Sequence, residues 1–214
     1  MYIFIAKGKQ KNRLSMMSCI RIFSRMDIYV TPIIHKTKRT PTKAFKGGVS
    51  KYAPIKDELI KLCQASNSIV TTMFDYYAMP EDTPSIDHQD IDIYKRIDFI
   101  ENAVNEDIGC KNLLFNLVLH EFEALLFSEP QAFEHIANDR VVRQLQAIRN
   151  SAETPEHINN SAETAPSKRI QNVVNGYSKV RQGIIVAKYI GIDKMMFECR
   201  HFSAWINKII DFTV

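Results

Sequence analysis

The 214-residue sequence predicts an α/β protein in which a parallel sheet of about four strands is flanked by helices and followed by a helical C-terminal part. Two observations carry this prediction. Short β-rich runs alternate with amphipathic segments of helix length in the first part of the chain, and beyond Glu121 the apolar spacing is helical to the end. We therefore expect an α/β core at residues 1–128 and a helical C-terminal extension at 129–214 that packs on this core.

Four apolar runs are the expected strands, at residues 2–6, 28–34, 69–74 and 113–119. Pro32 in the second run favours an edge position or a bulge, because proline has no N–H to donate to a neighbouring strand. The fourth run, NLLFNLVL, is almost entirely apolar, as is typical of a parallel strand that is buried on both faces.

Three segments between these strands, near residues 14–26, 55–62 and 93–104, have apolar residues at helical spacing and are the expected helices. Gly109 is the expected end of the last of them, because glycine tolerates the left-handed conformation found after a helix. A lysine-rich stretch at 35–52 contains Pro41 and a Gly-Gly pair and is expected to be a loop. In the C-terminal part, breaks are expected at Pro130, Pro155, Pro166 and Gly191.

Composition places the chain among cytoplasmic globular proteins. Its hydrophobic fraction of 45% is sufficient for a sizeable core. The four cysteines are far apart and form no CxxC pair, which argues against a zinc site or a disulfide framework. The only N-terminal apolar run is too short for a signal sequence or a membrane span, so we expect no membrane partner.

The net charge of +4 hides a strong asymmetry along the chain. Residues 1–61 carry 14 Lys and Arg against 3 Asp and Glu, whereas residues 75–134 carry 3 against 14. The two regions can simply pair with each other as solvated faces of one fold. Alternatively, a surface that attracts phosphate lies next to a carboxylate site that needs a cation.

Polar side chains follow two of the expected strands at the point where each strand ends. Asp75 closes the third strand, and His120, Glu121 and Glu123 close the fourth. Ligands of open parallel sheets bind outside the carboxyl ends of the strands, and carboxylate oxygens suit Mg²⁺ or Mn²⁺. The sequence therefore predicts a metal site formed by Asp75, Glu121 and Glu123, although acidic residues are also favoured in a first helical turn by the helix dipole alone.

Cationic groups that could hold a phosphate accompany these carboxylates. Lys168 and Arg169 lie near an expected helix start, with Ser167 and Thr164 as candidate caps. Trp205 shares helical spacing with Phe202 and Ile209 and is interpreted as a core residue. The lysine-rich loop is a candidate nucleic-acid-binding segment, with a solvated flap as the alternative. Its candidate contacts are Lys36, Lys38, Arg39, Lys43, Lys46 and Lys51.

Five ordered motifs resemble an uncharacterised prokaryotic family, domain of unknown function 4276. They are FKGGVSKY, VTTMFDYYAMP, LHEFEALLF, INNSAETAPSKRI and HFSAWI, and the resemblance extends from residue 28 to the C-terminus. Members of that family look like TOPRIM proteins, which have a Rossmann-like, metal-dependent fold. The resemblance implies a place beside an ATPase in phage defence or on mobile elements.

The resemblance breaks at the first strand. The family pattern expects a V-E-G-x-T-E type motif there, whereas this chain has AKGKQKN, with Lys7 in place of the key glutamate and Lys11 in place of the second. A protonated lysine cannot ligate Mg²⁺ and repels it. Three explanations stay open: the acid is lost in a degenerate copy, the N-terminal segment diverges from the family form, or Lys7 binds phosphate in a protein that no longer cuts.

The expected function is Mg²⁺-dependent nucleic-acid processing of the nuclease type, by two-metal hydrolysis, impaired if Lys7 prevents metal binding. His120 would orient a ligand or water, and Lys168 and Arg169 would neutralise the scissile phosphate. The alternative is a non-catalytic DNA-binding or ATPase-partner subunit of the same fold. A small-molecule phosphotransferase is disfavoured because the chain has no Walker or GxGxxG loop.

Overall fold

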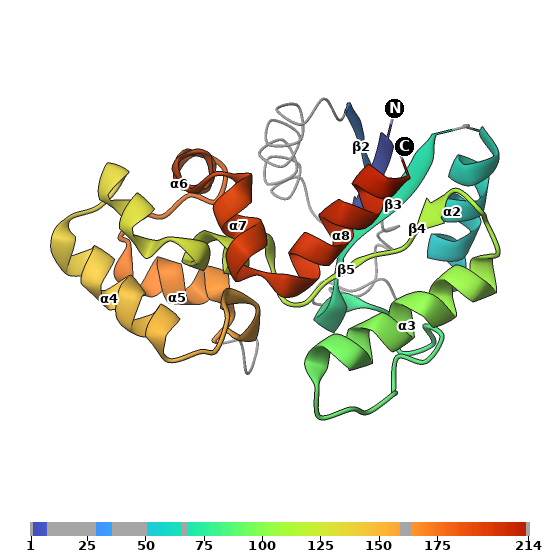
Figure 1. Cartoon of the computed structure of the whole chain (residues 1–214), viewed down its shortest axis with the longest axis horizontal. Helices are drawn as coiled ribbons and strands as arrows, with labels where there is room; N and C mark the ends of the chain where they lie inside the picture. The colour runs from blue at the N-terminus through green and yellow to red at the C-terminus, as the bar shows by residue number, and fades with distance from the viewer. Residues whose placement is uncertain (1, 8–28, 36–50, 66–67, 159–163, 213–214) are drawn as a thin grey trace, which may run out of the picture.

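A computed structural model describes residues 2–7, 29–35, 51–65, 68–158 and 164–212, with backbone only for 2–7 and 34–35. Figure 1 shows two lobes side by side, one built around the sheet and one built from short helices. The last helix, α8 (Arg200–Asp211), leaves the helical lobe and runs along the sheet lobe. The chain is therefore a mixed α/β protein with a helical C-terminal part, as predicted.

The sheet is parallel in every pairing that the described residues make. Its strands are β1 (Tyr2–Lys7), β2 (Val30–His35), β3 (Ile69–Asp75) and two short strands that both pair with β3. The order β2-β1-β3-β4 places β2 at one end of the described sheet. Pro32 therefore lies in a strand at one edge of the described sheet, as the sequence predicted.

The prediction of one continuous strand at residues 113–119 is wrong. It is divided into β4 (Leu113–Leu114) and β5 (Leu117–Val118). At the break, the hydroxyl of Thr72 donates to the carbonyl of Asn116 at 2.7 Å and accepts from its N–H at 2.8 Å. Because a side chain of β3 satisfies both backbone groups of Asn116, the regular ladder is interrupted there without leaving them unpaired.

One face of the sheet is covered by α2 (Ala53–Ala65) and α3 (Ile93–Ile108). Val70 and Phe74 of β3 point to this side and pack with the apolar stripes of both helices. Helix α3 begins at Asp92, whose carboxylate accepts the N–H of Tyr94 at 2.9 Å. It ends at Gly109 in the left-handed conformation, with φ of 68°, as the sequence predicted.

The opposite face of the sheet is covered by α8. Ile69 and Met73 point to this side, because alternate residues of a strand face opposite ways, and they share a core with Trp205, Ile206 and the helical lobe. The indole N–H of Trp205 donates to the hydroxyl of Thr71 at 2.8 Å. Trp205 is a core residue, as predicted, and α8 belongs to the packing of the sheet although it follows the expected boundary at residue 128.

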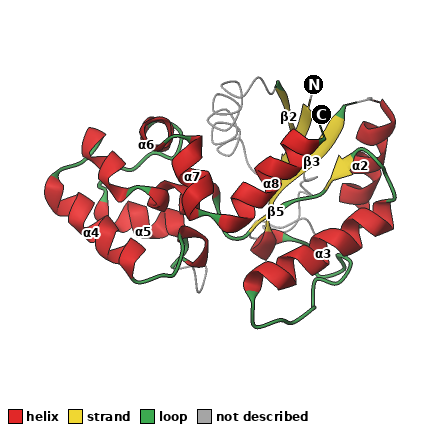
Figure 2. Ribbon diagram, in the orientation of Figure 1, coloured by secondary structure: helices red, strands yellow, loops and turns green. Residues whose placement is uncertain are grey.

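The helical lobe consists of short elements, shown with the rest of the fold in Figure 2. The segment behind Glu121 is a 3₁₀ helix, η3 (Phe122–Ser128), where the spacing suggested an ordinary helix. Three of the expected proline breaks are helix starts, because proline fits the first position of a helix. The lobe comprises η4 (Pro130–His135), α4 (Asp139–Asn150), η5 (Pro155–His157), α5 (Pro166–Val173), α6 (Gln182–Ile190) and α7 (Ile192–Glu198).

Two further expectations concern the environment of the chain. Cys63, Cys110 and Cys199 carry free thiols. Among the described residues, no helix combines the length and the apolar composition that a membrane crossing requires.

Candidate functional site

Asp75 and Glu121 lie at the same edge of the sheet. Asp75 is the last residue of β3, and the parallel register places it opposite Val118, the last residue of β5. Glu121 follows Val118 by three residues and precedes η3 in an extended conformation. Because the carboxyl ends of parallel strands face the same way, the fold brings these two predicted carboxylates to one edge.

Glu121 also reaches the start of α5, 46 residues further along the chain. Its Oε2 accepts the backbone N–H of Ser167 at 3.0 Å, in the first turn of that helix. The predicted caps Ser167 and Thr164 do not hold the N-cap position, which is occupied by Ala165. A carboxylate from another element therefore satisfies a helix N-terminus whose own cap residue has no side-chain acceptor.

Glu123 is buried and forms an ion pair with Lys179, a residue that was not among the predicted site residues. The ammonium of Lys179 lies 3.1 Å from Oε1 of Glu123 and 3.6 Å from Oε1 of Glu121. Burial raises the pKa of Glu123, a shift that the charge of Lys179 opposes and that of Glu121 reinforces. The same Oε1 makes no well-aligned hydrogen bond within the described part of the chain, so the contact with Lys179 is chiefly electrostatic.

Two tyrosines border the carboxylates. Burial of part of the phenol, followed by the charges of Asp75, Glu121 and Glu123, raises the pKa of Tyr77, although this side chain is 58% exposed overall. Burial and the charges of Glu123 and Glu121 raise the pKa of Tyr177. All three predicted carboxylates thus act on one phenol, which places them in a common negative field at this edge of the sheet.

His120 is neutral at pH 7. Burial, assisted by the charge of His157, lowers its pKa to about 4, although a hydrogen bond to the backbone of Glu156 favours the protonated form. It lines a small pocket of about 20 Å³ together with Glu121, Glu156 and Trp205. Such a volume holds about one water molecule. His120 is therefore placed as a neutral imidazole beside Glu121.

The structure does not bring the predicted phosphate-binding pair into contact with these carboxylates. Lys168 is exposed, and the Nε of Arg169 donates to the carbonyl of Thr164 at 2.8 Å. Lys179, in the turn between α5 and α6, is the cation that contacts Glu121 and Glu123. No motif or periodicity in NGYSKVRQ marks this lysine, because only long-range packing brings it to the strand ends.

Lys7 ends β1 at the same edge of the sheet as Asp75. Ala6 is paired with Met73 of β3. The backbone of Lys7 therefore lies beside the last residues of β3, which ends at Asp75. Lys51 is exposed, just before α2. Lys11 lies outside the described residues. The same holds for the other predicted nucleic-acid contacts, which are Lys36, Lys38, Arg39, Lys43 and Lys46.

The oxygen ligands predicted for a metal do not converge fully. In the described part of the chain, the only group of three or more acidic, histidine or cysteine ligands within 4.8 Å of one another is Asp98, Glu101 and His201. Asp75, Glu121 and Glu123 therefore fit a hard cation by their chemistry and their common edge. Their oxygens are farther apart than a single bound ion requires, and Lys179 already lies between two of them.

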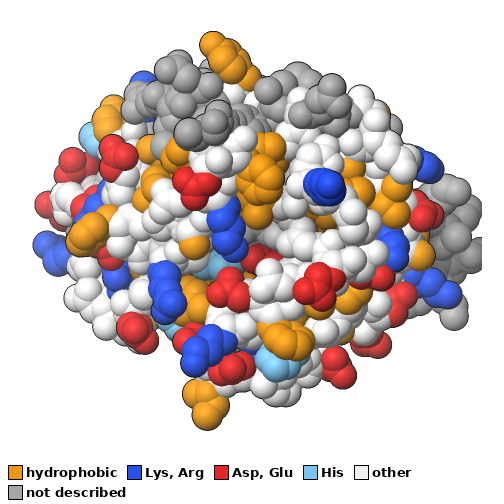
Figure 3. Space-filling model, turned by 45° about the vertical axis from the view of Figure 1, so that its right-hand side comes forward, with side chains coloured by type: hydrophobic (Ala, Val, Ile, Leu, Met, Phe, Trp, Pro, Cys, Tyr) orange, Lys and Arg blue, Asp and Glu red, His pale blue; other side chains and the backbone are white. Residues whose placement is uncertain are grey.

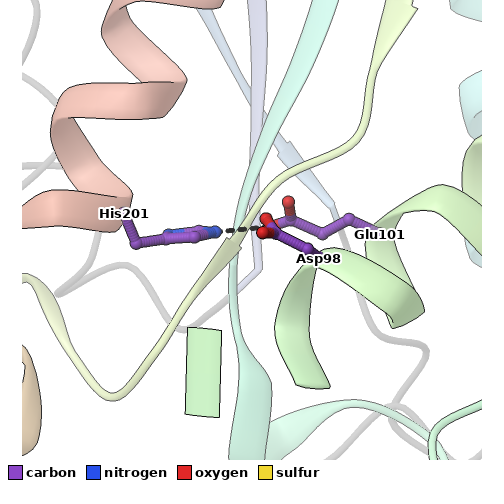
Figure 4. A group of neighbouring side chains, drawn as sticks. All are labelled: Asp98, Glu101 and His201. Atoms are coloured by element: carbon purple, nitrogen blue, oxygen red, sulfur yellow. Dashed lines mark ion pairs between the residues drawn. The ribbon is translucent and has the colours of Figure 1, made fainter. Parts of the chain in front are cut away.

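Figure 4 shows Asp98 and Glu101 of α3 pointing toward His201 of α8. The imidazole Nε2 lies 3.1 Å from Oε1 of Glu101, which also accepts the backbone N–H of Leu117 at 2.7 Å. Burial would lower the pKa of His201, but the hydrogen bond and charge of Glu101 outweigh it and raise the pKa. In the structure, His201 and Glu101 therefore form a buried ion pair that joins α8 to α3.

The molecular surface in Figure 3 adds a constraint on nucleic-acid binding. On the face shown, acidic and basic side chains are interspersed, and neither sign forms a continuous patch over the described residues. The strongly basic third of the sequence falls largely on residues outside the described ranges.

Fold and site together define a mixed α/β protein with carboxylates gathered at the carboxyl edge of a parallel sheet. The family model "Domain of unknown function (DUF4276)" matches residues 16–210, and the chain belongs to this family. No curated protein and no solved structure shows a significant match to the chain.

Proposed function

We propose that this chain is a nucleic-acid-processing protein of the nuclease type that depends on Mg²⁺ or Mn²⁺, with a TOPRIM/Rossmann-like core. The observation that supports it most directly is the position of Asp75, Glu121 and Glu123 at the carboxyl ends of β3 and β5. The strand order 2-1-3-4 supports the fold assignment, because doubly wound sheets of this order bind ligands at that edge.

Each site residue has a role that follows from its surroundings. Asp75, Glu121 and Glu123 would hold the cation, which would supply charge stabilisation to a phosphate and lower the pKa of a bound water. His120, neutral at pH 7, is able to accept or position a proton beside Glu121. Lys179, which contacts Glu121 and Glu123, would supply a positive charge for a phosphate, the role predicted from the sequence for Lys168 and Arg169.

A second candidate is a non-catalytic subunit that binds DNA or an ATPase partner. It is favoured by the ammonium of Lys179, which contacts both Glu121 and Glu123, and by the presence of a lysine, Lys7, as the last residue of β1. In this alternative the carboxylates are neutralised internally, and the protein binds nucleic acid without cutting it. The ATPase partnership and a role in phage defence or mobile-element biology are proposals that rest on the family resemblance.

The test is calorimetric titration with Mn²⁺ and Mg²⁺, together with cleavage assays on plasmid, single-stranded DNA and RNA. The proteins are the native chain, Asp75→Ala and, as a matched control, Glu106→Ala, which removes an exposed carboxylate of α3. Metal binding or cleavage that is lost in Asp75→Ala and kept in Glu106→Ala supports the metal-dependent function. Nucleic-acid binding without metal binding or cleavage in any of the three proteins supports the non-catalytic subunit.

A further inference from the structure

Two cysteines that are far apart in the sequence meet in the sheet lobe, near the start of β3. Cys63 lies in the last turn of α2, and Cys110 directly follows Gly109, the residue that ends α3. Gly109 is in the left-handed conformation, which lets the chain turn sharply after the helix. The turn brings the thiol of Cys110 into hydrogen-bond contact with the thiol of Cys63.

The backbones that carry the two thiols are held together by a neighbouring side chain, that of Asn112. Its amide donates to the carbonyl of Cys63 at 3.1 Å and to the carbonyl of Ser68 at 3.0 Å. The backbone carbonyl of Asn112 accepts the N–H of Val70, at the start of β3, at 2.8 Å. These bonds hold the segment of Cys110 against the end of α2. A disulfide requires cysteines whose backbones already lie close together, and the fold meets this requirement here.

The two thiols differ in their access to solvent. Cys63 is 7% exposed and belongs to the core shared by α2 and α3, whereas Cys110 is half-buried and packs against that core. Burial, followed by the hydrogen bond with Cys110, raises the pKa of Cys63. Because the thiolate is the reactive form of cysteine, Cys110 is the thiol that an oxidant in solution reaches first, and Cys63 reacts second.

We infer that Cys63 and Cys110 are a redox modification site, a dithiol that closes to a disulfide on reaction with a small disulfide, such as oxidised glutathione, or with a peroxide. In the first case the Cys110 thiolate attacks one sulfur of the small disulfide, and the other sulfur leaves as a thiol. The Cys63 sulfur then attacks Cys110 and displaces the remaining small thiol. The protein gives up two electrons and two protons, which reduce the small disulfide to two thiols.

Hydrogen peroxide leads to the same product by a different first step. The Cys110 thiolate attacks one oxygen of the peroxide, the O–O bond breaks, and a sulfenic acid forms at Cys110 as hydroxide leaves and takes up a proton. The Cys63 sulfur then attacks the Cys110 sulfur and displaces its oxygen, which leaves as water. The two electrons of the dithiol have then reduced the peroxide to water.

The cross-link would join the end of α2 to the segment between α3 and β4. The chain between the two cysteines forms β3 and α3, so the closed loop is long, and closing it restricts the unfolded chain more than the folded one. The oxidised protein is therefore expected to unfold at a higher temperature than the reduced protein. The inference is independent of the proposed function, because the test needs neither metal nor nucleic acid.

The experiment treats the reduced native chain with oxidised glutathione and, separately, with hydrogen peroxide. Free thiols, intact mass, unfolding temperature and the disulfide-linked peptides of a digest are then measured. The expected product has lost about two of its four thiols and the mass of two hydrogen atoms, and dithiothreitol restores both. The digest is expected to contain one linked peptide pair, which joins Cys63 to Cys110.

Three variants identify the thiols that react. Cys110→Ala is expected to form no internal disulfide and to gain no stability from oxidation. Cys63→Ala is expected to stop at the mixed disulfide of Cys110 with glutathione, because the second thiol is absent. The control is Cys199→Ala, which removes another buried thiol, one that contacts the hydroxyl of Ser128 at 3.4 Å. It is expected to close the disulfide as the native chain does. If a variant does not fold, the linked peptides of the native chain decide.

Four results would overturn the inference. The first is a native chain that keeps all of its thiols in both oxidants. The second is a digest in which the linked peptides contain other cysteines. The third is native protein that accumulates the mixed disulfide or an over-oxidised Cys110, which would show that Cys63 does not react second. The last is an oxidised form that unfolds at a lower temperature than the reduced form, which would show that the bond distorts the fold.

Discussion

The imidazole of His201 and the carboxylate of Glu101 form a buried contact of 3.1 Å that joins α8 to α3 at the start of β5. Both side chains are at most 7% exposed, and Glu101 also holds the backbone N–H of Leu117. This contact fastens the last helix of the chain to the sheet lobe, on which it lies in Figure 1, although the elements of the helical lobe come between the two in the sequence.

The first prediction is a pH dependence of stability that comes from His201. Its pKa in the folded protein lies above the ordinary value of 6.5, so its protonated form stabilises the fold fully below about pH 6.5. This contribution is lost as the pH rises through the raised pKa of the folded state. The free energy of unfolding in urea, measured across this range, is expected to fall for the native chain and to change less for His201→Gln. Equal pH profiles for the two proteins would contradict the prediction.

The second prediction concerns Gly183 and Tyr177. A Cβ at Gly183 would lie 2.7 Å from the hydroxyl oxygen of Tyr177 but 3.7 Å from the ring carbon that bears it. Gly183→Ala is therefore expected to destabilise the native chain by about 1–3 kcal/mol. In a Tyr177→Phe background the clash is gone, and the same change is expected to be neutral or to stabilise α6 by up to about 1 kcal/mol.

Denaturant unfolding of the four proteins in this cycle measures the coupling. Tyr177→Phe alone should cost little, because the hydroxyl that it removes has no partner among the described residues. An equal cost of Gly183→Ala in both backgrounds would show that the hydroxyl is not the obstacle.

The third prediction is that Trp205 and Thr71 are energetically coupled across 134 residues of sequence. Trp205→Phe removes the indole donor, and Thr71→Val removes its acceptor, so the cost of the double variant should be less than the sum of the two single costs. A coupling of about 1 kcal/mol is expected from one buried hydrogen bond. Chemical unfolding provides the measurement, and the pair Trp205→Phe and Lys56→Met, whose members are far apart, serves as the uncoupled control.

The fourth prediction is that the native chain cleaves nucleic acid weakly or not at all and that Lys7→Glu raises Mg²⁺ binding and cleavage. The change adds an oxygen ligand at the end of β1 and alters the local charge by two units. Unit charges about 4 Å apart interact by about 4 kcal/mol at an effective dielectric near 20, so an increase in affinity of about tenfold or more is expected.

Calorimetry and plasmid cleavage with Lys7→Glu, alone and combined with Asp75→Ala, test this expectation. Robust native cleavage that survives Asp75→Ala would show that these carboxylates are not the catalyst. A folded Lys7→Glu protein that neither binds metal more tightly nor cuts would favour the non-catalytic subunit.

Local pattern was sufficient to predict the frame of the fold. The apolar run of β3, the helical spacing of α3 and the glycine at its end appear in the structure as the sequence predicted, because period and capping depend on neighbouring residues. The division of the fourth strand was not predicted. Its cause is the hydroxyl of Thr72 bonded to Asn116, a contact between residues 44 positions apart.

The sequence by itself determined which residues end the strands, and therefore that Asp75 and Glu121 are at one edge of a parallel sheet. Only the tertiary structure decided what those carboxylates contact. Glu121 holds the start of α5, and Lys179 lies between Glu121 and Glu123, because the helical lobe folds back onto the strand ends. Strand ends follow from short-range hydrophobic pattern, whereas the partner of a buried charge is set by whichever distant segment packs against it.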